Sequence, residues 1–261
     1  PCSSFSMAGN REKDWGKDKK FREGQAEQVL DTLFFDFIDL AKELQPKVVV
    51  AENVKGLLLG SAKNYVMRIY KAFDEAGYYC QHFLLNASKM GVPQRRERVF
   101  FICLRKDLAS QFLHMEDMFT EVPKIEMEFN EKEIPFKEFR TYNVYERHLS
   151  PAFLKAWENR IEGDLDMSCT MGRVFDRPNS FFNYNYIYDY KILNTITSND
   201  NNVVFDEPRY LNNKELCIGG TYPQDYNFLK LKTSYLVGMS VPPVMTAQIA
   251  SNIYEQWLSK I

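Results

Sequence analysis

Residues 47–54 read Lys-Val-Val-Val-Ala-Glu-Asn-Val, and this stretch decides the fold class. The segment 47–51, with its unbroken apolar run from Val48 to Ala51, is typical of a strand buried on both faces of a parallel sheet. A helical pattern precedes it, because apolar residues recur at three- and four-residue spacing over 25–44 and Pro46 closes the run. A helix followed by a buried strand predicts an α/β fold.

The same alternation of elements continues downstream. A second helix is marked by Val66, Ile69, Tyr70 and Phe73 and ends at Gly77. Strands are expected at 78–85 and 98–104, with a turn at 91–93 between them. Near the end of the chain, a helix begins at two prolines and places Met245, Ile249, Ile253 and Trp257 at helical spacing. We expect this last helix to dock on the α/β core.

The middle of the chain has a different pattern. Residues 116–138 are acidic and contain two prolines, which favours a solvated face or a linker. Tyr184, Tyr186, Tyr188 and Tyr190 alternate with other residues, so a strand would place all four on one face. One aromatic face is more often core than a nucleic-acid surface. We therefore expect a smaller, β-rich domain here with the tyrosines in its core.

Composition narrows the class of protein. The 261 residues are 45% hydrophobic with a formal charge of −2, so any polyanion must be held by local patches. The 12 glycines include no Gly-x-Gly, which excludes a Gly-rich nucleotide loop. Five cysteines without a Cys-x-x-Cys pair argue against a disulfide framework and a zinc site and favour a reducing cytoplasm. No apolar stretch approaches the roughly 20 residues of a membrane helix, and no signal pattern opens the chain.

Three short segments carry residue types suited to catalysis. Residues 1–9 begin with Pro-Cys, residues 51–54 read Ala-Glu-Asn-Val at the expected end of a buried strand, and residues 94–98 read Gln-Arg-Arg-Glu-Arg. Taken singly, each has an ordinary explanation: a buried thiol, a salt-bridge partner after a strand, and a surface arginine cluster. Their order along one chain is what points to chemistry.

In that order the three segments resemble the catalytic motifs of the C5-cytosine DNA methyltransferases. Further resemblance lies in Thr-Ile-Thr at 195–197, in Pro-Arg-Tyr-Leu at 208–211 with Glu215, and in Gly-Met-Ser-Val-Pro-Pro at 238–243. The resemblance implies an incomplete Rossmann-like methyltransferase sheet with a smaller target-recognition domain. It divides the chain into the C-terminal part of the catalytic domain (1–110), the target-recognition domain (111–225) and a C-terminal segment that returns to the catalytic domain (226–261).

The resemblance also assigns the catalytic roles. The Cys2 thiolate adds at carbon 6 of cytosine, so that carbon 5 becomes nucleophilic enough to take a methyl group from S-adenosylmethionine. Glu52 hydrogen-bonds ring nitrogen 3 and the exocyclic amine, which requires transient protonation that burial at the strand end would favour. Arg96 and Arg98 direct positive charge toward the cytosine carbonyl, Glu52 or a phosphate. The target cytosine must be flipped out of the duplex to be reached.

The same resemblance implies the residues that bind the cofactor and DNA. It implies no metal ion. Pro1, Met239 and Ser240 are expected to contact the cofactor. The segment that follows the Pro-Cys loop is basic, and its side chains could close over phosphates. The DNA-contact candidates are Arg11, Lys13, Lys17, Gln94, Arg173 and Arg177, with Gln94 also expected to orient its loop.

Members of this family carry a Gly-rich strand and loop and ribose-binding acids ahead of the Pro-Cys motif, and these are absent here. We therefore expect a cofactor-binding segment in the same protein or in a separate subunit, and an inactive chain without it. The leading expectation is a DNA cytosine-5 methyltransferase of a bacterial, archaeal or phage restriction-modification system. The alternatives are a non-catalytic DNA-binding subunit or remnant, and a tRNA cytosine-5 methyltransferase.

Overall fold

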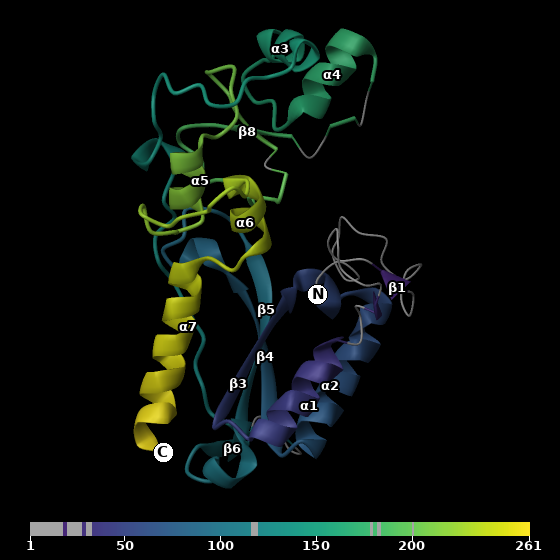
Figure 1. Ribbon diagram of the computed structural model, residues 1–261, viewed down its shortest axis with the longest axis vertical. Coiled ribbons are helices and arrows are strands. Elements are labelled where there is room, and N and C mark those ends of the chain that lie inside the picture. Colours follow the sequence, from purple (N-terminus) through teal and green to yellow (C-terminus); the bar gives the residue numbers. More distant parts are fainter. Residues whose placement is uncertain are drawn as a thin grey trace. The chain divides into compact units, whose positions relative to one another are not determined.

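The computed structural model describes residues 18–19, 28–29 and 33–261, apart from 116–119, 178–179, 182–183 and 200. The chain forms two compact units (Figure 1). Unit 1 comprises residues 1–85, 97–127 and 251–261, and unit 2 comprises residues 86–96 and 128–250. The boundaries expected near residues 110 and 225 stay a prediction. Within the described ranges, no helix has the length and apolar character needed to cross a membrane.

Unit 1 is built on a three-stranded sheet with the strand order β3-β5-β4. The strands are β3 (Val48–Val54), β4 (Tyr78–Asn86) and β5 (Glu97–Arg105). β5 is central, and its residues 99–104 are at most 3% exposed. β3 runs antiparallel to β5, with Val48 opposite Leu104 and Val54 opposite Arg98. The α/β class predicted from the sequence is confirmed.

Two details of the strand prediction are wrong. β3 was expected in a parallel sheet, yet its described partner β5 is antiparallel. It was also expected to be buried on both faces, yet Val49 and Ala51 are 4% and 7% exposed while Val50 is 41% exposed. The reason is that β3 is an edge strand whose one face packs on helices. A run of valines reports strand propensity and does not fix the direction of the neighbouring strand.

Helices α1 (Leu33–Leu44) and α2 (Lys63–Glu75) lie side by side on one face of this sheet (Figure 1). Their apolar residues, among them Ile38 and Phe73, form one core with the inward-facing residues of β3 and β5. α2 ends before Gly77, whose φ of +91° suits a glycine after a helix. The first helix begins later than expected, because Gln28–Val29 forms β2, which pairs with β1 (Asp18–Lys19).

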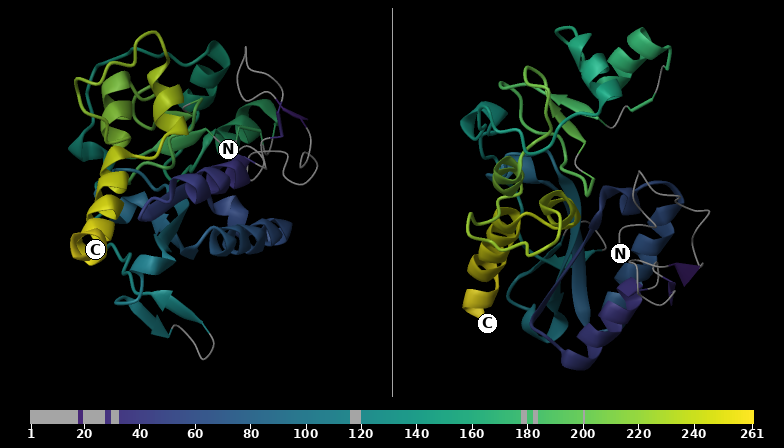
Figure 2. Two further views of the ribbon diagram at one scale, coloured as in Figure 1. Left: turned by 60° about the horizontal axis from the view of Figure 1, so that its bottom comes forward. Right: turned by 45° about the horizontal axis from the view of Figure 1, so that its top comes forward.

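The rest of unit 1 includes a two-stranded ribbon and the end of the last helix. β6 (Leu113–Met115) and β7 (Glu121–Pro123) pair antiparallel in this ribbon (Figure 2). α7 (Pro243–Gln256) leads to Trp257, whose indole Nε1 donates to the Lys124 carbonyl at 2.8 Å. The four apolar positions predicted for this helix are at most 3% exposed, so the helix prediction is confirmed. Short 3-10 turns are η3 (Lys55–Leu58), η4 (Gly60–Ala62), η5 (Ala87–Lys89), η6 (Lys106–Leu108), η7 (Phe136–Glu138) and η8 (Leu258–Lys260).

In its described part, unit 2 has more helix than strand and is otherwise loop and turn, so the expectation of a β-rich domain is wrong. Its helices are α3 (Pro151–Glu158), α4 (Met167–Phe175), α5 (Asn213–Gly219) and α6 (Thr233–Met239). Its sheet has two short parallel strands, β8 (Asn185–Ile187) and β9 (Asn202–Val204). Two apolar clusters support these elements, one around α5 and α6 and one around α3 and α4.

The alternating tyrosines do not form a four-residue ladder on one strand. β8 ends at Ile187, and a turn follows that leaves Tyr190 63% exposed. Tyr186 and Tyr188 are each 4% exposed and belong to the core around α3 and α4. The preference for core over a nucleic-acid surface is therefore confirmed for these two tyrosines.

Candidate functional site

In unit 1 the structure brings Glu52 and Arg98 together on the face of β3 and β5 that points away from helices α1 and α2. Glu52 lies opposite Phe100 and Arg98 lies opposite Val54, so the two residues are diagonal neighbours on one face of the sheet. The Arg98 Nε lies 2.9 Å from the Glu52 Oε1. A second Arg98 nitrogen donates to the Glu97 carbonyl at 2.8 Å, which fixes the guanidinium. The antiparallel register thus creates the pairing of the two motif residues.

The surroundings of Glu52 differ from the expectation in one respect. Glu52 lies inside β3, which continues through Asn53 and Val54, and its side chain is 31% exposed. The sequence predicted that burial at a strand end would favour a protonated Glu52 carboxyl. In the described chain, Glu52 is neither at the strand end nor fully buried. Asn53 points to the opposite, buried face, and its Oδ1 accepts from the Val54 amide at 2.8 Å. The carboxylate of Glu52 is held by an arginine and remains accessible to a ligand.

In unit 2, the side chains of Gln94 and Arg96 are fully interior. Gln94 is 0% exposed, donates to the Gly219 carbonyl at 2.7 Å and accepts from the Ile196 amide at 3.1 Å. Arg96 is 1% exposed and donates to the carbonyls of Ile196 at 3.0 Å and Gly238 at 2.8 Å. These two side chains tie three segments that are far apart in the sequence.

Two of these segments, around Thr197 and around Gly238, approach each other very closely. A Cβ atom at this position would lie 2.2 Å from the Thr197 carbonyl carbon and 2.3 Å from the Ser198 nitrogen. Only glycine lets the two backbones meet in this way. The Thr-Ile-Thr and Gly-Met-Ser-Val motifs are thus packed backbone to backbone, with Arg96 bridging a carbonyl of each.

Two of the predicted roles therefore need correction. Gln94 was expected among the DNA contacts, but its side-chain amide is buried. Its nitrogen and its oxygen both hydrogen-bond to backbone groups of unit 2. Arg96 was expected to direct charge toward the substrate, but its guanidinium donates to two backbone carbonyls of unit 2. An extended segment alternates its side chains, so positions 94 and 96 face inward while Arg95 and Glu97 are exposed. Gln94 and Arg96 hold backbone segments of unit 2 together.

A buried ion-pair network holds the segment that contains Arg209 and Glu215. Both side chains are 0% exposed and lie 2.8 Å apart at Nη1 and Oε2. Asn212 caps α5, and its side chain and that of Glu215 form a reciprocal capping box. Arg209 also pairs with Glu207 at 2.5 Å. Burial would raise the pKa of Glu207, but hydrogen bonds from its arginine partners hold that pKa below its usual value.

Arg140 is an interior residue that the sequence pattern did not reveal. Its side chain is 2% exposed and pairs with Asp189 at 2.6 Å, Asp206 at 2.9 Å and Glu207 at 2.6 Å. Its guanidinium also lies over the Tyr142 ring at 4.6 Å from the centroid. No local motif marks this arginine, because its three acidic partners lie roughly 50 or more positions away in the sequence.

The other predicted residues lie partly outside and partly inside the described chain. Pro1, Cys2, Arg11, Lys13 and Lys17 lie outside the described residues. Arg173 is used within unit 2: two of its nitrogens bind the Asp164 carboxylate at 3.0 and 2.5 Å, which argues against its predicted role in base reading. Arg177 follows α4 and is exposed, so its DNA contact stays a prediction.

The two cofactor candidates in the described chain lie at the end of α6. Met239 is 39% exposed. Ser240 caps the helix, and its hydroxyl donates to the Val237 carbonyl at 3.1 Å. The described residues hold no group of histidine, cysteine and acidic side chains arranged for a metal ion.

The fold of the chain is similar to that of methyltransferases of known structure. A crystal structure of a Spodoptera frugiperda DNMT2 mutant is similar with a TM-score of 0.59 and 18% identity, covering 97% of this chain and 77% of the other. At this identity the likeness concerns the fold alone. It is the fold class expected from the sequence.

Sequence comparison then gives the family. The family model of the C-5 cytosine-specific DNA methylases matches residues 1–255. The chain therefore belongs to this family. M.FnuDI of Fusobacterium nucleatum, a type II methyltransferase, is 50% identical over 108 residues, which are 41% of this chain and 28% of that protein. M.SPRI of Bacillus phage SPR, an orphan methyltransferase, is 43% identical over 108 residues, which are 41% of this chain and 22% of that protein. The matched segments thus span less than a third of either relative.

Proposed function

We propose that this chain supplies the cytosine-activating and target-recognition parts of an S-adenosylmethionine-dependent DNA (cytosine-5) methyltransferase. The pairing of Glu52 with Arg98 in unit 1 carries this proposal, because two motif residues 46 positions apart meet at 2.9 Å and the Glu52 side chain is 31% exposed. The family membership supports the same reaction class. The proposed setting is the cytoplasm of a bacterium, an archaeon or a phage-infected cell, in restriction-modification.

The proposed chemistry uses the chain's own residues in sequence. The Cys2 thiolate adds to carbon 6 of a cytosine flipped out of the duplex, and carbon 5 then takes the methyl group. Loss of the carbon 5 proton and elimination of the thiolate restore the ring and the enzyme. Glu52 hydrogen-bonds ring nitrogen 3 and the exocyclic amine during the addition, and Arg98 orients the Glu52 carboxylate. Arg98 thereby acts through Glu52.

S-adenosylmethionine, when bound, supplies the methyl group. The described residues fit a contact at the edge of this cofactor: the Met239 side chain is accessible, and the Ser240 oxygen can still accept a hydrogen bond while its proton is donated to Val237. Pro1 is the third proposed contact. These residues alone do not enclose a ligand of that size, so the proposal includes a further cofactor-binding segment.

The edge of the unit 1 sheet is the proposed place for that segment. In the described chain, β3 has a strand neighbour on one side only, so its other backbone edge is open. Beside it lies an open hollow of about 220 Å³ lined by apolar residues of α1 and β3. Leu40 and Leu44 in this lining are 55% and 70% exposed, and Val50 is 41% exposed. A strand pairing with β3 would cover both the backbone edge and these side chains.

The test compares the complete protein, with its cofactor-binding segment, on duplex DNA and on tRNA. Methyl incorporation from S-adenosylmethionine into duplex DNA is the expected result. Incorporation into tRNA alone would favour the RNA alternative, and tight DNA binding without transfer would favour a non-catalytic subunit. Glu52→Gln is expected to lower kcat by roughly 10²–10⁴-fold, the usual contribution of acid–base catalysis.

The matched control is Lys55→Gln. Lys55 pairs with Glu97 at 2.9 Å next to the Glu52 pair, but the side chains of Lys55 and Glu97 are each 43% exposed. Exposed pairs of this kind contribute little, so kcat is expected to stay within about twofold. An equal loss in Lys55→Gln and Glu52→Gln would show that the effect is structural and not catalytic.

A further inference from the structure

Two cysteines of unit 1 take no part in the site around Glu52. Cys80 lies on β4 and is partly exposed, whereas Cys103 lies on the central strand β5 and is 0% exposed. Cys103 belongs to the apolar core that the sheet forms with α1 and α2, and Cys80 packs against this core. The two side chains therefore share the helix-covered face of the sheet.

The register of β4 and β5 places these two cysteines directly opposite each other. At one end of the two strands the Lys106 amide donates to the Gly77 carbonyl at 2.9 Å, and at the other end the Ala87 amide donates to the Arg96 carbonyl at 2.9 Å. β4 and β5 are therefore antiparallel neighbours. Counting three residues inward from the first bond, or seven residues inward from the second, reaches the two cysteines on both strands.

The two cysteines form the closer of the two kinds of cross-strand pair. In an antiparallel ladder, hydrogen-bonded pairs alternate with non-hydrogen-bonded pairs. Gly77 and Ala87 belong to hydrogen-bonded pairs, so Cys80 falls in a non-hydrogen-bonded pair. The Cα atoms of such a pair are about 4.5 Å apart. This separation lies within the range of about 4.4–6.8 Å that a disulfide spans, so a bond between the two sulfurs needs little movement of the backbone.

The two thiols differ in their access to solvent. Cys80 is partly exposed on a strand at the edge of the described sheet, so a small solute can reach its sulfur. Burial raises the pKa of the Cys103 thiol well above its usual value, and a hydrogen bond with the Cys80 side chain raises this pKa further. Cys103 therefore stays a protonated, interior thiol, and an oxidant in solution reaches Cys80 first.

From this arrangement we propose that Cys80 and Cys103 form a redox-sensitive pair, which a hydroperoxide converts to a reversible disulfide between β4 and β5. The inference goes beyond methyl transfer and does not depend on it. In a reducing compartment such bonds are transient and respond to oxidants. Cys103 faces the helices, whereas Arg98 on the same strand faces the other side of the sheet. The disulfide would therefore fix β4 to β5 without contacting the Glu52–Arg98 pair.

The oxidation balances in two steps. The Cys80 thiolate attacks one oxygen of the hydroperoxide, so that a sulfur–oxygen bond forms, the oxygen–oxygen bond breaks and the leaving oxygen takes up the thiol proton. The Cys103 sulfur then attacks the sulfur of the sulfenic acid. A sulfur–sulfur bond forms, and the hydroxyl group leaves with the Cys103 proton as water. Two thiols are oxidised, and the hydroperoxide is reduced to water and an alcohol, or to two waters when it is hydrogen peroxide.

The experiment treats the complete protein with hydrogen peroxide, blocks the remaining thiols with iodoacetamide and digests the protein with trypsin in the absence of a reductant. Trypsin releases Cys80 in the peptide 72–89 and Cys103 in the peptide 99–105, and each peptide contains one cysteine. Mass spectrometry is expected to find these two peptides joined, with two hydrogen atoms fewer than the separate peptides. Dithiothreitol should separate them.

Variants identify the two sulfurs. Cys80→Ser should abolish the linked peptide, whereas Cys169→Ser should leave it unchanged, because Cys169 is a partly exposed cysteine on α4 of unit 2. A Cys80 peptide that is oxidised to the sulfinic acid without a link overturns the inference. A Cys80 peptide joined to the Cys2 peptide, or to a second copy of the protein, overturns it as well. Each of these results leaves the proposed methyl transfer standing.

A second measurement tests whether the bond fixes β4 to β5. A disulfide that closes the 80–103 loop restricts the unfolded chain, so the oxidised protein should melt about 5–10 °C above the reduced protein. The comparison is made with Cys80→Ser treated in the same way, so that oxidation at other residues cancels. The difference should disappear in dithiothreitol. A linked peptide without a rise in Tm overturns the proposed fixing of the strands.

Discussion

Replacing Glu215 by glutamine tests the buried ion-pair network of unit 2. The Glu215 carboxylate accepts from Arg209 at 2.8 and 3.0 Å, from the Thr141 amide and hydroxyl at 2.9 and 3.1 Å, and from the Asn212 amide at 3.0 Å. Each carboxylate oxygen therefore receives donors. Glutamine keeps the shape of the side chain, but one of the two oxygens becomes an NH2 group. In either orientation of the amide, this NH2 group faces hydrogen-bond donors that it cannot accept from.

The magnitude follows from burial. Removing one partner of a fully buried ion pair costs about 3–5 kcal/mol, because the other charge is left in the interior. Arg209 keeps Glu207 at 2.5 Å, so the lower end, about 3 kcal/mol, is expected. For a unit of this size, such a loss lowers Tm by roughly 10 °C.

Thermal and urea unfolding, followed by circular dichroism, measure this loss. The control is Glu138→Gln, whose side chain is 58% exposed and which should change stability by less than about 0.5 kcal/mol. Arg209→Met, Glu215→Leu and the variant with both changes form a separate double-mutant cycle, in which the two changes should couple by about 2 kcal/mol. A loss below about 1 kcal/mol in Glu215→Gln, or additive effects in the cycle, would refute the reasoning.

Two further predictions concern stability. Gly238→Ala should lower the free energy of unfolding by about 1–3 kcal/mol in urea titrations, since its Cβ would meet the backbone of Thr197 at 2.2 Å; a loss below about 0.5 kcal/mol would contradict the close approach. Burial raises the pKa of Tyr188 to about 12, above its unfolded value near 10. The contribution of the protonated Tyr188 to the free energy of unfolding is therefore fully present below pH 10 and is lost as the pH rises to about 12. Tyr188→Phe should lack this part of the alkaline loss when unfolding is measured at pH 8 to 12, and an unchanged pH dependence would count against it.

The helices were predictable because their periodicity is local. The apolar spacing of α2 and its end before Gly77 agree with the structure, and so does the buried stripe of α7 from Met245 to Trp257. The late start of α1 was not predictable, because Val29 fits the helical spacing but lies in β2. A few residues at the end of a periodic run carry too little signal to separate a helix from a strand.

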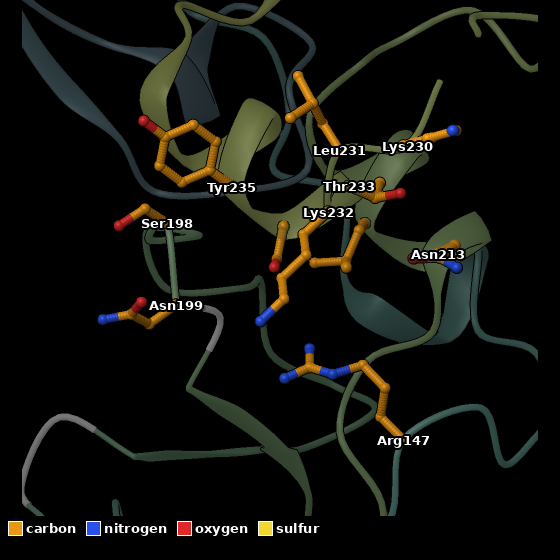
Figure 3. A pocket seen from close by; sticks show the side chains of 11 residues that line it. Arg147, Ser198, Asn199, Asn213, Lys230, Leu231, Lys232, Thr233 and Tyr235 are labelled. Atoms are coloured by element: carbon orange, nitrogen blue, oxygen red, sulfur yellow. The ribbon is translucent and has the colours of Figure 1, made fainter. Parts of the chain in front are cut away.

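The site was predictable in part, for a different reason. The motif types identified Glu52 and Arg98, which the structure pairs at 2.9 Å, but they did not show which arginines of the 94–98 segment face inward. The alternation of side chains along an extended segment could have shown this, because it places Gln94 and Arg96 on one side and the exposed Arg95 and Glu97 on the other. Arg147 and Lys232, which line a cavity of about 720 Å³ in unit 2, carried no signal, since only the fold brings them together (Figure 3).

The most direct test of the account is covalent trapping on DNA that contains 5-fluorocytosine. Fluorine at carbon 5 cannot leave as a proton would, so the proposed Cys2 addition should end in a stable protein–DNA adduct after methyl transfer. The complete protein, incubated with this DNA and S-adenosylmethionine, is expected to form an adduct that survives denaturing electrophoresis and is lost in Cys2→Ala. No adduct with the unmodified protein, or an adduct that persists in Cys2→Ala, would contradict the central claim.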